Sequence, residues 1–125
     1  MHPNEQASQV ARVQREEQQN YRNTMTHDLT KEFQLRYVHV RREDVFGRLA
    51  GKGGVTVAYQ LPPRGSRTIV AACSICHERD SYCKRDGRFY ASRNFASGER
   101  IKLHVPKNTT IPRFLNAMFG VMTYY

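Results

Sequence analysis

The chain has 125 residues, a length that suits one domain with a modest hydrophobic core. Apolar residues make up 39% of it, and no apolar run approaches the roughly 18 residues that a membrane-spanning helix needs. It carries 20 Lys and Arg against 11 Asp and Glu, and this formal charge of +9 favours a polyanion, a nucleotide or a negatively charged surface as partner.

The positive charge is unevenly distributed along the chain. Residues 1–36 contain five basic and five acidic groups, so the whole excess of +9 falls in residues 37–125. We therefore expect a polar N-terminal arm at residues 1–28 and a basic domain at residues 29–125. The alternative is that the basic surface serves only solubility.

The cellular location is predicted from the N-terminus and the cysteines. Residues 1–20 have too few apolar side chains for a signal peptide. Three cysteines within eleven residues are an odd number and a poor disulfide framework. We expect a soluble cytoplasmic protein.

The arm and the first strands follow in chain order. Residues 5–21 favour helix but form no continuous apolar stripe, which predicts a solvated helix, or a mobile arm that becomes ordered on a partner. Apolar and polar residues alternate from Phe33 to Val40, which predicts a strand, and a loop over residues 41–54 follows. Residues 55–61 and 67–73 read as two more strands. The second has an apolar run at residues 69–72, typical of a central strand covered on both faces.

The C-terminal half is predicted to be mostly helical. Ser74 suits the N-cap of a helix that runs to about Ala96, and Gly87 would let another backbone approach it closely. A fourth strand at residues 101–105 and a short helix at residues 111–119 follow, and residues 121–125 form a final strand or a packed extension. The sequence thus predicts an α+β fold, with an antiparallel or mixed sheet of four to five strands, one long helix packed across it and a polar helical N-terminal arm.

Two motifs resemble known sites but fit them poorly. Cys73, Cys76 and Cys83 with His77 suggest zinc, yet their spacing lacks the paired ligands of a zinc knot, so we favour reduced core thiols and expect no metal. The glycine-rich residues 47–54 are one residue short of a phosphate loop and precede a strand, which favours a hairpin or a flexible flap.

The predicted long helix carries the candidate ligand-binding residues. Lys84 and Arg88 lie one turn apart and suit a phosphate, with Arg85 beside them. Arg79, Asp86 and Arg93 are spaced by seven, which predicts either an internal ion network or a pocket in which an arginine meets a phosphate. The aromatic residues expected to stack on a base are Tyr82, Phe89 and Tyr90.

The segment from Ala72 to Arg88 carries a Cys-Ser pair, an Asp-x-aromatic group, a basic pair and Gly-Arg, with Ala91 and Arg93 beyond. In this it resembles small phage proteins of the anti-Thoeris sponge family, which sequester cyclic-nucleotide immune signals as oligomers without degrading them. The resemblance extends to the strand at residues 53–59. It implies that Lys84, Arg88 and Tyr59 line a nucleotide pocket between protomers, in the host cytoplasm if the protein is phage-encoded.

The sequence therefore predicts a binding protein. No paired carboxylates or activated serine motif indicate an enzyme, and no cofactor is expected. The expected ligand is a nucleotide-type small molecule, and the alternative is that the protein binds DNA or RNA. We also expect a homo-oligomer in which the N-terminal arm packs on the neighbour's apolar C-terminal region, residues 114–125.

Overall fold

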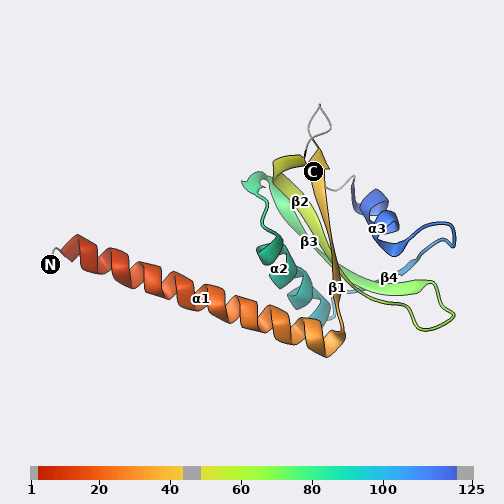
Figure 1. Cartoon of the computed structure of the whole chain (residues 1–125), viewed down its shortest axis with the longest axis horizontal. Coiled ribbons are helices and arrows are strands. Elements are labelled where there is room, and N and C mark those ends of the chain that lie inside the picture. Colours follow the sequence, from red (N-terminus) through yellow and green to blue (C-terminus); the bar gives the residue numbers. More distant parts are fainter. Residues whose placement is uncertain (1–2, 44–48, 121–125) are drawn as a thin grey trace.

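The computed structural model describes residues 3–43 and 49–120, and the alternating apolar segments of the sequence form its sheet (Figure 1). All strand pairs are antiparallel, in the order β1-β2-β3-β4. The predicted α+β class with an antiparallel sheet is confirmed. The elements are α1 (Pro3–Phe33), β1 (Arg36–Glu43), β2 (Leu49–Gln60), β3 (Thr68–Ser81), α2 (Lys84–Ala96), β4 (Ile101–His104) and α3 (Ile111–Gly120).

Helices cover both faces of the sheet. Side chains alternate between the faces of a strand, so Val55 and Val57 of β2 face the core beneath α3 while Ala58 faces α2. Leu115 and Phe119 of α3 are buried on the first face. The second face is closed by α2 residues, with Phe95 fully buried.

The predicted central strand is confirmed by β3. Its consecutive apolar residues divide between the two cores, because Ile69 and Ala71 join the core under α3 and Ala72 joins the core under α2. Such a strand needs no polar face, which explains its unbroken apolar run.

Helix α1 packs mainly on α2 through its C-terminal half and extends well beyond the sheet (Figure 1). Its end is fixed by the Phe33 ring, whose centroid lies 5.4 Å from that of Phe95, and by Gln34, which has a positive φ of 54°. The N–H of Leu35 then donates to the carbonyl of Thr30 at 2.9 Å, which closes the helix. None of the described helices is both long and apolar enough to cross a membrane.

Two predicted boundaries in the first half are wrong. The N-terminal helix does not end near residue 28, because α1 continues to Phe33. The first strand, predicted to begin at Phe33, therefore begins only at Arg36. The predicted loop at residues 41–54 is largely strand, since β1 extends to Glu43 and β2 begins at Leu49. Gly53 and Gly54 have positive φ values beside the break in strand register, so the glycines belong to irregular strand geometry. Residues 44–48 lie outside the described residues.

The largest correction concerns the predicted helix from Ser74 to Ala96. Its first third is strand, because β3 continues to Ser81 and α2 begins only at Lys84. Ser74, Ile75 and Cys76 pair with Thr56, Val55 and Gly54 of β2, respectively. Pairing with the long β2 therefore outweighs the local helix signal.

The shorter C-terminal elements agree with the sequence prediction. Strand β4 ends one residue earlier than predicted, and α3 ends one residue later, differences within the usual uncertainty of element ends. The predicted strand or extension at residues 121–125 lies outside the described residues.

Candidate functional site

A cleft of about 730 Å³ separates the C-terminal half of α1 from the first turns of α2. Most of its polar groups are basic or hydroxyl-bearing, and its described lining includes no carboxylate or thiol. The residues used below are His27, Thr30 and Lys31 of α1, Tyr37 of β1, and Arg85 and Arg88 of α2.

Helical spacing gathers the cations of this cleft. Arg85 and Arg88, three residues apart, are its cations from α2, while Lys84, one turn before Arg88, projects from the same side of the helix without lining the cleft. Arg88 is half-buried, whereas Lys84 and Arg85 are exposed. Lys31 approaches from the last turn of α1. The two helices thus direct cations at one cleft, although the sequence separates them by more than fifty residues.

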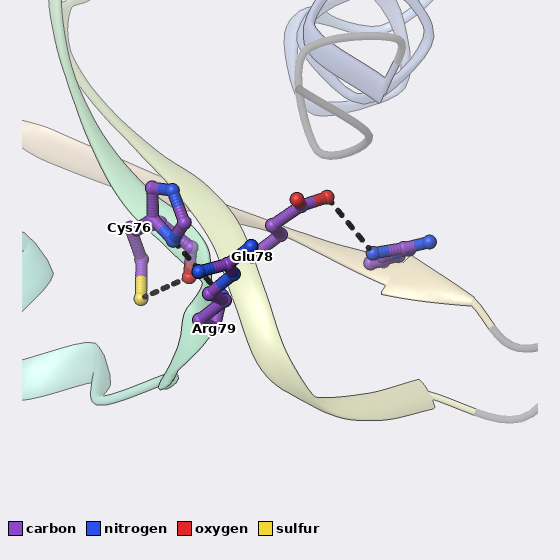
Figure 2. Close-up of polar contacts among 5 residues, drawn as sticks. Cys76, Glu78 and Arg79 are labelled. Atoms are coloured by element: carbon purple, nitrogen blue, oxygen red, sulfur yellow. Dashed lines mark hydrogen bonds and ion pairs between the residues drawn. The ribbon is translucent and has the colours of Figure 1, made fainter.

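No described carboxylate neutralises these cations. Between described residues there is one ion pair, Arg42 with Glu78 at 3.6 Å, and it lies outside the cleft (Figure 2). An arginine in a partly desolvated cleft attracts an anion strongly, and a guanidinium suits the paired oxygens of a phosphate. The cleft can therefore bind an anion.

The positive potential extends to His39 beneath α2. Burial, followed by the charges of Arg88 and Lys84, lowers the pKa of His39 from 6.5 to about 4. Arg88 also opposes the rise in pKa that burial causes for Tyr37 and Tyr82. The charge of Arg88 thus acts on all three side chains, and on His39 it is the strongest influence after burial.

A hydrogen-bonded cluster supports the cleft from the sheet side. The hydroxyl of Tyr82 lies 2.8 Å from Nδ1 of His39 and 2.9 Å from Oγ1 of Thr56, and His39 Nδ1 lies 3.2 Å from the same Oγ1. A second pair joins the Thr30 and Tyr37 hydroxyls at 2.5 Å. The first set joins β1, β2 and the segment before α2, and the second joins α1 to β1. Thr30 and Tyr37 line the cleft, so their bond holds its wall in one arrangement.

The structure brings together only some of the predicted ligand-binding residues. Lys84 and Arg88 lie one turn apart on α2, as the sequence predicts. Phe89, Tyr90 and Arg93 instead line a second groove of about 680 Å³, on the opposite side of the α1–α2 contact. The Arg93 guanidinium lies 5.7 Å from the centroid of the Phe89 ring. Phe89 is buried, so Tyr90 is the exposed aromatic side chain of this groove on α2.

Three predicted residues lie elsewhere. Tyr82 is half-buried and its hydroxyl belongs to the His39 cluster, while its ring packs where a Cβ on Gly54 would come within 2.5 Å. Arg79 is exposed near the end of β3, so the predicted network with Asp86 and Arg93 along one helix is wrong. Tyr59 is 5% exposed in the core under α3, on the other face of the sheet from the cleft.

Cys76 and Cys83, but not Cys73, line a third, smaller cavity of about 300 Å³ beside the end of β3. Cys76 lies against the irregular last part of β3, with its Sγ 3.5 Å from the carbonyl oxygen of Asp80. The backbone N–H of Arg79 donates to Nδ1 of His77 at 3.0 Å in the same part of the strand (Figure 2). All three thiols are free and half-buried, and across residues 3–43 and 49–120 no three metal-binding side chains are grouped closely enough to hold an ion.

Several residues of the cleft were not predicted from the sequence as site residues. His27, Thr30 and Lys31 fall at or near the predicted arm boundary, where no ligand site was expected. Tyr37 and His39 are two apart in a strand, which places them on one face, and this alternation was the available signal. Only the packing of α1 on α2 identifies them as neighbours of Arg88.

Comparison with known proteins adds no further assignment, since no family model, curated protein or solved structure matches this chain.

Proposed function

We propose that this protein binds a phosphate-bearing ligand, of the nucleotide type, in the cleft between α1 and α2. The observation that carries the proposal is the set of three cations, Lys31, Arg85 and Arg88, around one cleft without a described carboxylate as partner. A volume of about 730 Å³ is within the usual range of small-ligand sites, roughly 300–1,000 Å³. The cleft is built from one protomer, so binding does not require assembly.

The proposed role is sequestration without chemical change. The described lining offers cations and hydroxyls that can hold a phosphate, and it lacks a carboxylate or thiol that could act as nucleophile or orient His27, its one histidine. His39 is neutral and engaged with Tyr82 and Thr56. This agrees with the resemblance to the anti-Thoeris sponge family, which makes a cyclic-nucleotide immune signal the first ligand to test.

The direct test is titration calorimetry at low salt against a panel of cyclic nucleotides and ADP-ribose derivatives. We expect Arg88→Gln to weaken binding about tenfold to a hundredfold, because a hydrogen bond to a charged group contributes about 1.5–3 kcal/mol. Arg113→Gln is the matched control, since it removes the same charge from an exposed position on α3. Chromatography of the released ligand should return it unchanged.

The proposal fails if no member of the panel binds, or if Arg88→Gln and Arg113→Gln weaken binding equally. Recovery of a converted ligand would retain the site but contradict sequestration without chemical change.

Nucleic-acid binding is the second candidate, and the formal charge of +9 with only one ion pair between described residues favours it. Contacts with several phosphates would give a steep fall in affinity with salt. Fluorescence anisotropy with labelled single-stranded and duplex DNA and RNA at several salt concentrations distinguishes the candidates, because a mononucleotide gives a shallower slope. Absence of binding at low salt would exclude this alternative.

A further inference from the structure

Exposed apolar side chains are concentrated on one surface of the molecule. Val10, Val13 and Tyr21 of α1 are 56%, 49% and 67% exposed, and Tyr90 of α2 is 40% exposed. They are four of the eight large apolar residues that are exposed among the described residues. Such clustering on a soluble protein indicates a contact surface.

The three α1 residues lie on one face of the helix. At about 100° per residue, Val10, Val13 and Tyr21 fall within an arc of about 80°. Arg12 and Arg15 fall on the opposite side of the helix, where they remain hydrated, whereas Glu17 lies within the arc. We call the face with Val10, Val13 and Tyr21 the arm face.

The first half of α1 has no support within its own protomer. Every side chain from Ala7 to Gln18 is exposed, and this part of the helix extends past α2 and the sheet (Figure 1). A polar helical segment of this length is marginal in water without packing against another surface. Packing against a partner would stabilise it.

The arm face continues into the groove beside α2. Gln14, Glu17, Gln18 and Tyr21 line that groove on the α1 side, and Tyr90 and Arg93 are among its residues from α2. Because the groove follows the axis of α1, a helix is the shape that fits it.

We propose that the α1 helix of a second copy of this chain occupies the groove, antiparallel to the first, around a two-fold axis. In this alignment Val10 of each protomer contacts the partner's Tyr21, and each arm covers the groove at the other's α2. The occupant follows from self-complementarity, since the arm face supplies the apolar stripe together with Glu17, and the groove supplies amides, Tyr90 and the Arg93 cation that they would meet. The antiparallel arrangement also opposes the two helix dipoles.

This interface replaces the expected contact between the arm and the neighbour's C-terminal region. In α3, Leu115 and Phe119 are already buried against the sheet of their own protomer. Met118, 40% exposed, is the large apolar side chain that α3 leaves accessible. Most of the apolar surface of α3 is therefore used in packing on its own sheet.

Sedimentation velocity over a wide concentration range tests the interface. We expect the wild-type chain to dimerise and Val10→Glu to weaken dimerisation at least about tenfold, because a carboxylate would have to be buried without a partner. Ser8→Glu is the matched control, since it adds the same charge two residues away on the opposite side of the helix and should change the dissociation constant less than about twofold. Circular dichroism verifies that each variant folds.

A charge-pair variant tests the alignment. Val10→Glu and Tyr21→Lys should each weaken the dimer, and the double variant should recover much of the loss, because each Glu would face the partner's Lys. Within one helix these positions are eleven residues apart, about 16 Å, so the rescue cannot be intramolecular. A parallel pair would place like charges together and show no rescue.

A monomeric wild-type chain would overturn the proposal, and so would a dimer that Val10→Glu leaves intact or a double variant without recovery. These substitutions leave Arg85 and Arg88 unchanged, so the ligand titration tests the proposed function separately.

Discussion

His39 is a half-buried side chain whose ionisation is coupled to folding. Its ring lies between the sheet and α2, where burial, then Arg88, then Lys84 lower its pKa from 6.5 to about 4. The folded protein therefore holds His39 neutral over a range in which the unfolded chain protonates it. Since the unfolded state binds more protons there, the free energy of unfolding rises with pH.

We predict that acidification from pH 6.5 to 4 destabilises the protein through His39. Because the ring is only half-buried, solvent screening reduces the effect to about 1–2 kcal/mol. Urea denaturation at several pH values measures it. His39→Gln should flatten the dependence in this window, whereas His104→Gln, at an exposed position on β4, should not. Parallel pH profiles for the wild type and His39→Gln would contradict the prediction.

At the scale of elements, the contact of α2 with β2 is set by a glycine. A Cβ on Gly87 would come within 2.0 Å of Thr56 Oγ1, so only glycine lets the helix approach the sheet this closely. The sequence predicted close approach of another backbone at Gly87, and the structure places the Thr56 side chain there instead. Thr56 is fully buried there and belongs to the His39 cluster.

We predict that Gly87→Ala lowers the free energy of unfolding by about 1–3 kcal/mol, because overpacking outweighs the gain in helix propensity. Gly120→Ala is the control, since it is also helical and a Cβ there meets nothing within 4 Å. That variant should be neutral or more stable by up to about 1 kcal/mol. Equal stabilities of the two variants in thermal or chemical denaturation would show that the approach is looser than the structure indicates.

A second contact between elements fixes the arm to the body. The Arg100 guanidinium lies 4.5 Å from the centroid of the Phe95 ring and 5.3 Å from that of Phe33, and its Nε donates to the carbonyl of Phe95 at 2.7 Å. The end of α1, the end of α2 and the segment before β4 therefore meet at one point. This anchor orients α1 so that the cleft and the groove lie on either side of it.

At the scale of the whole molecule, the excess of positive charge dominates. With +9 on 125 residues and one ion pair between described residues, self-repulsion destabilises the folded state. The same imbalance attracts anions to the basic cleft.

We predict that the melting temperature rises with ionic strength, and rises further in phosphate than in chloride at equal ionic strength. Chloride screens the charges generally, whereas phosphate also binds the cleft and stabilises the folded state by mass action. Differential scanning calorimetry measures both effects. Arg88→Gln should remove the additional effect of phosphate, whereas Arg113→Gln should retain it. A melting temperature that responds equally to the two anions would contradict specific binding.

The sequence alone predicted the fold class, the helical nature of the arm, and strands and helices wherever one local pattern prevailed. The alternation at Ile101 to His104 and the apolar face of residues 111–119 needed no tertiary context, because strand and helix spacing are properties of neighbouring residues. The concentration of positive charge beyond residue 36 and the one-turn spacing of Lys84 and Arg88 also followed from the sequence alone.

Tertiary structure alone decided the state of residues 74–81 and the composition of the cleft. Those residues are strand because β2 offers them a partner, and strand pairing is a contact between segments that local patterns do not report. Lys31 and Arg88 face one cleft because the chain reverses at Gln34 and α1 packs on α2. The contact of Phe33 and Arg100 with Phe95 fixes this packing. The sequence determined which groups could bind an anion, and the packing of distant elements decided which of them lie together.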